Sequence, residues 1–155
     1  MSAHTATVTW ERTPHPEITG DYSRDHHWAF DGGLTVGVSS APSFAGNPAL
    51  VDPEEALIAS VASCHMLWFL HLASRAGHEV ARYGDEPNGT MERDSRGRVS
   101  ITRIDLRPIV EWAGDQAPKD DVVKQLHVTA HEKCFIANSL RSEITLHGSE
   151  LGSPE

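Results

Sequence analysis

The stretch DPEEALIASVASCHMLWFLHLASRAG, residues 52–77, decides the fold of this 155-residue chain. It opens with the residues of a capping box. Asp52 is a candidate N-cap, Pro53 suits the first helical position, and Glu55 can bond back to the cap. We therefore predict a helix from Pro53 to about Arg75, which a glycine two residues later would terminate.

Apolar side chains surround this helix almost completely instead of forming one stripe, which indicates burial on most sides. A chain of this length cannot cover such a helix with one sheet, so we expect a partner subunit to cover the remainder. The run from Ala56 to Ala73 approaches the length of a membrane span. Two glutamates precede it, however, and it contains several side chains that favour a buried core helix: Ser60, Ser63, Cys64, His65 and His71.

The remaining predicted elements are strands on both sides of the long helix and one further helix after it. The patterns predict a strand at Thr5–Trp10, a hairpin in 27–40 around Gly32-Gly33, two long strands in 88–112 around Asp94–Gly97, a helix from Pro118 to near Cys134, and a last strand at Glu143–His147. This order is typical of the α+β class with antiparallel sheets. No repeat or linker interrupts it, so we expect one domain over residues 1–155.

Composition limits the function classes. The chain has 13 basic and 22 acidic residues and a formal net charge of -9. Nucleic-acid binding requires clustered Lys and Arg, and a membrane surface attracts polybasic segments, so we expect neither partner. The first residues, MSAHTATVTWERTP, lack the features of a secretory signal, and we expect a cytoplasmic protein.

The two cysteines, Cys64 and Cys134, can be interpreted either as structural residues or as reactive thiols. Free cysteine is often simply a buried apolar residue. A nucleophilic role would require a neighbour that lowers the thiol pKa, such as an arginine. No CxxC motif is present, and neither a hydrolase nor a nucleotide-binding motif appears. His131 lies on one helix face with Cys134, but no four-ligand zinc pattern is formed, so we expect no metal site.

The sequence around the cysteines resembles the OsmC/Ohr family, the osmotically inducible and organic-hydroperoxide-resistance proteins. The resemblance rests on DPEEALIASVASCHMLWFL and AHEKCFIANS, and it extends to GDYSRDHHWAFDGG and ITRIDLRP, which are similar to the OsmC-like branch. It covers the chain from about Thr5 to Leu146. It implies an intertwined homodimer in which two long central helices are wrapped by antiparallel sheets.

The resemblance also implies an activity. Family members reduce peroxides, preferably organic hydroperoxides, with thiols and without metal or flavin, and a lipoyl-type dithiol restores the thiols. Matched residue by residue, Cys64 corresponds to the cysteine that attacks the peroxide and Cys134 to the resolving cysteine that forms a disulfide with it. The apolar side chains of Met66, Trp68 and Phe69 would favour hydrophobic peroxides.

Two charged residues complete the set that the resemblance implies. Arg24 would stabilise the Cys64 thiolate, and Glu54 would hold Arg24 by a bidentate pair; Arg12 and Glu55 are their nearest competitors. Ten residues of helix separate Glu54 from Cys64, about 15 Å along the axis. We therefore expect either a composite site at the dimer interface, with the glutamate from the partner subunit, or a broken start of the helix.

Two alternatives remain at this point. The same dimer pocket could serve a non-catalytic stress protein that binds a small molecule or lipid, and a redox-sensing or zinc-binding module is a weaker possibility. A binding protein has no need of two cysteines, an arginine and a glutamate together, and this favours the peroxidase.

Overall fold

The computed structural model describes residues 3–114 and 117–148. It has two compact units, residues 1–56 and 57–155. The mixture of helices and sheets agrees with the α+β class expected from the sequence. That the whole chain acts as one domain stays a prediction.

The first unit contains a three-stranded antiparallel sheet in the order β1-β2-β3. Its strands are β1 (Ala6–Thr9), β2 (His26–Phe30) and β3 (Thr35–Val38). The predicted Gly32-Gly33 turn is confirmed: the Gly33 N–H donates to the Phe30 carbonyl over 2.9 Å, and Gly33 has a φ of 84°. A short 3-10 turn, η1 (Pro42–Phe44), follows the sheet.

The predicted long helix is confirmed as α1 (Pro53–Arg75), one uninterrupted helix. The capping box is present at its start, because the Glu55 N–H donates to Asp52 Oδ1 over 2.8 Å and the Asp52 N–H donates to Glu55 Oε2 over 3.2 Å. The helix ends at Arg75, and the φ of 81° at Gly77 lets the His78 N–H reach the Ala73 carbonyl. The alternative of a broken helix start is therefore wrong.

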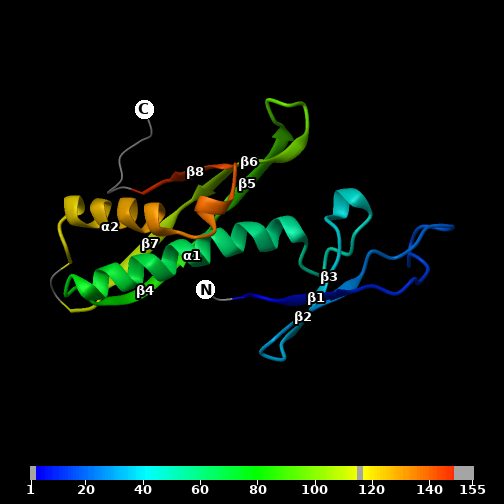
Figure 1. Cartoon of the computed structure of the whole chain (residues 1–155), viewed down its shortest axis with the longest axis horizontal. Helices are drawn as coiled ribbons and strands as arrows, with labels where there is room; N and C mark the ends of the chain where they lie inside the picture. Colours follow the sequence, from blue (N-terminus) through cyan, green and yellow to red (C-terminus); the bar gives the residue numbers. More distant parts are fainter. Residues whose placement is uncertain (1–2, 115–116, 149–155) are drawn as a thin grey trace. The chain divides into compact units, whose positions relative to one another are not determined.

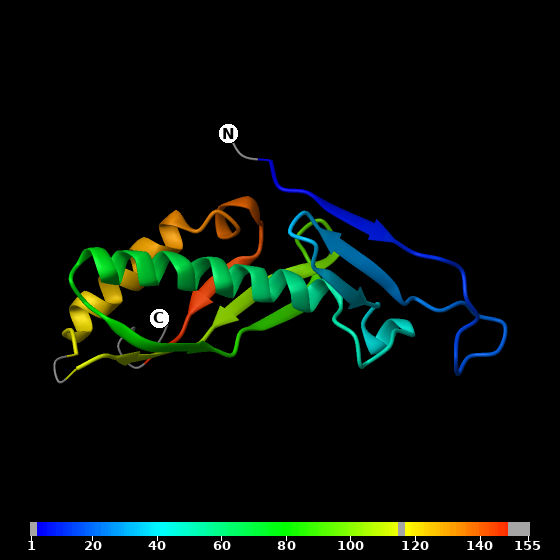
Figure 2. The same cartoon turned by 90° about the horizontal axis from the view of Figure 1, so that it is seen from below.

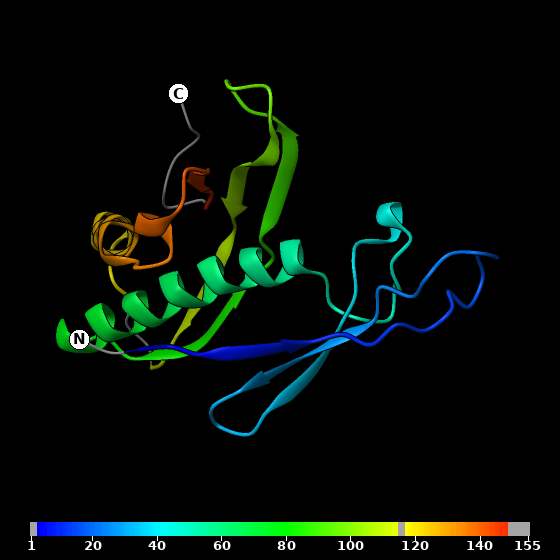
Figure 3. The same ribbon diagram turned by 45° about the vertical axis from the view of Figure 1, so that its right-hand side comes forward.

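The second unit carries the rest of α1, a second helix and two further sheets (Figure 1). Strands β4 (Val80–Asp85) and β7 (Pro108–Trp112) form an antiparallel pair. The other sheet has the order β5-β6-β8, with β5 (Asn88–Arg93), β6 (Val99–Leu106) and β8 (Glu143–Leu146). Figure 3 shows β5 and β6 side by side up to their connecting turn.

Two expectations about these sheets need correction. Residues 88–112 form three strands instead of two, and β4 was not predicted at all. The sheets are not purely antiparallel, because β8 pairs with β6 in parallel. The physical reason is the connection: α2 (Asp120–Lys133) lies between the two strands in sequence, and such a helical crossover returns the chain in the same direction.

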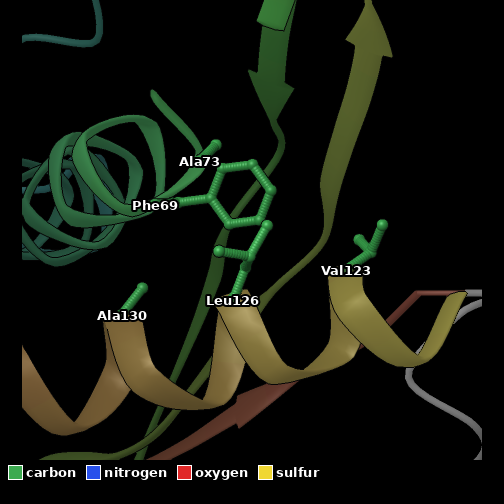
Figure 4. Packing of buried hydrophobic residues seen from close by; sticks show 5 residues of the cluster. All are labelled: Phe69, Ala73, Val123, Leu126 and Ala130. Carbon is green, nitrogen blue, oxygen red and sulfur yellow. The ribbon is translucent and has the colours of Figure 1, made fainter. Parts of the chain in front are cut away.

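Helix α2 lies alongside α1 in two perpendicular views (Figures 1 and 2). Phe69 and Ala73 of α1 form one buried cluster with Val123, Leu126 and Ala130 of α2, and the Phe69 ring lies against Leu126 (Figure 4). A second cluster joins α1 to the other sheet through Val61, Ala62, Ile104 and Leu106.

Helix α1 is long and apolar enough to cross a membrane by length and composition, a test that buried core helices also pass. Its Val61, His65, Phe69 and Ala73 are buried within the protein, as a core helix requires. Leu67, on another side of the helix, is 61% exposed.

Candidate functional site: a cysteine pair and an arginine pocket

The cysteines of the two helices meet in the second unit. Cys64 lies in the middle of α1, and Cys134 is the residue that ends α2. Cys64 is one of the groups that raise the pKa of Cys134, so the two side chains are neighbours, and both are free thiols. Two cysteines that are 70 residues apart in the sequence therefore lie next to each other in the fold.

The environments of the two thiols differ. Cys134 is completely buried, and its sulfur accepts a hydrogen bond from the Ala137 N–H over 3.4 Å. Burial, with the hydrogen bond to Cys64 as a second cause, raises the pKa of Cys134 to about 11. Cys64 is only half-buried. At neutral pH Cys134 is therefore a protonated thiol behind the more accessible Cys64.

Cys64 opens into a pocket of about 550 Å³. Apart from the cysteine, the pocket is lined by Ser60, Ser63, Leu67, Trp68, His71, Phe135 and Ile136. The Trp68 ring meets the rings of Phe135 and His71 edge-on, at centroid distances of 5.5 and 5.8 Å. These walls suit an apolar or aromatic group next to the Cys64 sulfur. Of the three side chains expected there from the sequence, only Trp68 lines this pocket.

A buried histidine pair lies on the other side of α1. His65 Nε2 and His127 Nδ1 are 3.0 Å apart, and their rings stack nearly parallel. Burial lowers the pKa of His65 to about 3, with the charges of His127 and His131 as further causes. His65 is therefore neutral at physiological pH and contributes a hydrogen bond to the core.

The first unit holds the other two candidate residues. Arg24, just before β2, and Glu54, in the first turn of α1, line one pocket of about 580 Å³. Aromatic side chains of Trp10, Tyr22 and Phe44 form part of its wall. The competing Arg12 is not in the described lining of this pocket, and the Glu55 carboxylate is bound to the Asp52 N–H in the helix cap.

The carboxylate that binds Arg24 is not the one expected. Arg24 Nη1 lies 2.7 Å from Asp21 Oδ2 and donates to the Tyr22 carbonyl, and the guanidinium stacks 4.2 Å from the centre of the Tyr22 ring. Among residues 3–114 and 117–148 there is no ion pair between Arg24 and Glu54. In this structure Arg24 is therefore paired with Asp21, three residues before it, and the bidentate pair with Glu54 stays a prediction.

Sequence reasoning missed Asp21 and Tyr22 as partners of Arg24, and it missed the contact between His65 and His127. An acidic residue three positions before an arginine was the available signal for the first. No local signal could reveal the second, since 62 residues separate the two rings. In the described parts of the chain no three His, Cys, Asp or Glu side chains are grouped as metal ligands.

Comparison with known proteins identifies the class. The family model described as OsmC-like protein matches residues 46–147. Mixed α+β folds of this kind recur in solved structures. An OsmC-like protein of unknown function from Vibrio cholerae is 40% identical, with 95% of this chain and 99% of that chain covered and a TM-score of 0.89.

Other similar structures are more distant in sequence. An organic hydroperoxide resistance protein from Elizabethkingia anophelis is 18% identical, with coverage of 94% and 93% and a TM-score of 0.70. One from Bacillus subtilis is 18% identical, with coverage of 94% and 96% and a TM-score of 0.66. A search of curated proteins found no match. The chain belongs to the OsmC-like family.

Proposed function

We propose that this protein is a thiol-dependent peroxidase that reduces organic hydroperoxides to alcohols. One observation carries the proposal: a half-buried Cys64 opens into an apolar pocket while a fully buried Cys134 lies next to it. A structural thiol needs neither a pocket nor a second thiol within reach. The names of two distant structural relatives, both organic hydroperoxide resistance proteins, add support.

The first step is attack by the Cys64 thiolate on the distal oxygen of the hydroperoxide. The O–O bond breaks, the alkoxide takes a proton and leaves as the alcohol, and the sulfur is oxidised by two electrons to a sulfenic acid. The apolar pocket beside Cys64 would hold the organic part of the peroxide. This favours hydrophobic hydroperoxides over hydrogen peroxide.

The second step forms the disulfide. Cys134 attacks the Cys64 sulfenic acid, an S–S bond forms, and the hydroxyl leaves with the Cys134 proton as water. The high pKa of Cys134 keeps it from competing for peroxide, since the thiolate is the nucleophile. A dithiol of the lipoyl type, which can form its own cyclic disulfide, then returns two electrons and two protons to the pair.

Arg24 and Glu54 complete the proposed site. A guanidinium is always charged and can stabilise a thiolate while it binds the peroxide. Helix α1 is continuous, so Glu54 is about 15 Å along the axis from Cys64 of its own chain. We propose that the site is composite, with the Glu54 near each Cys64 supplied by the partner subunit of a homodimer.

The experiment that tests the function is a single turnover. Reduced protein is mixed with cumene hydroperoxide, free thiols are counted, and the intact mass is measured on the same sample. We expect loss of both thiols in each chain and a mass decrease of about 2 Da, the signature of an internal disulfide. If both thiols persist, the peroxidase proposal fails. The pocket beside Cys64 would then be tested for binding of a small molecule or lipid.

A further inference from the structure

Asp21 and Tyr22 hold Arg24 like a clamp, and they contact only part of its guanidinium group. All of the ionic and hydrogen-bonded contacts of Arg24 that the structure shows are made by Nη1, to Asp21 Oδ2 and the Tyr22 carbonyl, and one face of the group is covered by the Tyr22 ring. Within the described residues, Nε and Nη2 carry no such contact. These two nitrogens form the edge that binds carboxylates or oxyanions in a bidentate manner.

The clamp is itself held in place. The Asp21 carboxylate is fixed at both oxygens, because Oδ1 accepts the Tyr22 N–H over 2.8 Å while Oδ2 binds Arg24. The Tyr22 ring packs edge-on against Trp10 at a centroid distance of 5.7 Å, and Trp10 Nε1 donates to the Ser23 carbonyl over 2.9 Å. The Arg24 and Asp21 side chains are only 22% and 28% exposed. A loop that served only to connect strands would not require this arrangement.

We infer that Asp21 and Tyr22 are positioning residues, which hold Nη1 and one face of Arg24 so that its Nε–Nη2 edge is presented to Glu54 and the peroxide. The inference rests on the proposed peroxidase function, and it adds two residues that do not themselves touch the reacting atoms. The negative charge of Asp21 is bound at the far edge of the guanidinium, so it does not occupy the edge needed for substrate.

The test compares the rate of Cys64 oxidation by cumene hydroperoxide in the wild type and in variants. Asp21→Asn should slow the attack roughly 10- to 100-fold, the scale of a misplaced catalytic group. Asp21→Glu should recover part of the rate. Asp94→Asn is the matched control, because Asp94 binds Arg96 in a similar local pair on the β5–β6 turn.

Tyr22 supplies a second, independent comparison. Tyr22→Phe keeps both the ring and the backbone carbonyl and should react like the wild type, whereas Tyr22→Leu removes the stacked ring and should slow the attack. If the wild type is active and both Asp21→Asn and Tyr22→Leu react at the wild-type rate, the positioning inference is wrong while the proposed function stands. A wild type that does not consume the peroxide would overturn the proposed function, and the positioning role with it.

Discussion

Cys64 and Cys134 show how burial gives two identical side chains different environments. Cys134 is fully buried at the end of α2, and desolvation raises its pKa to about 11. Cys64 lies in the middle of α1, half-buried and beside a pocket. A buried thiol resists ionisation, so we expect peroxide to meet Cys64 first.

Replacing each cysteine should separate the two steps. Cys64→Ser should abolish peroxide consumption, because no nucleophile remains at the pocket. Cys134→Ser should keep the first attack near the wild-type rate and stop at a sulfenic acid that cannot form the disulfide. Stopped-flow kinetics of one turnover, followed by dimedone labelling and mass spectrometry, would measure both. Equal loss of the first step in the two variants would contradict these roles.

His65 predicts a pH dependence of stability. Its folded-state pKa of about 3 lies below the ordinary value of 6.5, mainly because burial disfavours the charged ring. The unfolded state therefore binds a proton between pH 6.5 and 3 that the folded state does not. The free energy of unfolding should be unaffected by His65 above pH 6.5 and should fall by on the order of 4 kcal/mol down to pH 3.

Urea unfolding at fixed protein concentration across this pH range would measure the effect. His65→Leu should flatten the dependence even if it lowers stability at neutral pH, because the titrating ring is gone. His27→Gln, at an exposed position of β2, is the control and should keep the wild-type slope. A wild-type slope in His65→Leu would show that other groups determine the acid sensitivity.

At the scale of elements, the start of α1 depends on a local signal. Asp52 is buried and accepts the Glu55 N–H at the helix start. Asp52→Ala leaves that donor without its cap and should lower the free energy of unfolding by about 1 kcal/mol. Asp52→Asn retains an oxygen acceptor and should lower the free energy of unfolding clearly less. Denaturant unfolding of the two variants measures the difference, and equal stability would argue against the cap.

At the scale of the whole molecule, we expect a partner to cover the exposed apolar side chains around the Cys64 pocket. Leu67 is 61% exposed and Phe135 68% exposed, and both line the pocket. Exposed apolar patches of this kind mark interaction sites. A second copy of the chain, as proposed for the composite site, would remove them from water.

Leu67→Lys should therefore weaken the proposed dimer, because a charge would be buried in its interface. Light scattering after size-exclusion chromatography, over a range of protein concentrations, would show a shift from dimer to monomer. Val99→Lys, at a position 58% exposed on β6, is the control and should leave the mass unchanged. A wild type that is monomeric at all concentrations would contradict both the dimer and the composite site.

The sequence by itself determined the elements whose signals are local. The capping box at Asp52 and the glycine at position 77 define α1, and the Gly32-Gly33 pair defines the β2–β3 turn, because each acts over a few residues. The family resemblance of the two cysteine segments also came from the sequence, and the matching family model confirmed it. The cytoplasmic location stays a prediction.

Only the tertiary structure decided which distant groups meet. It brought Cys64 to Cys134, stacked His65 on His127, and paired β8 with β6 in parallel. It also paired Arg24 with Asp21, a partner that was not expected from the sequence. These contacts depend on how helices and strands pack across tens of residues, and on the charges and burial that packing creates. Sequence patterns act over one or two turns and carry no such distances.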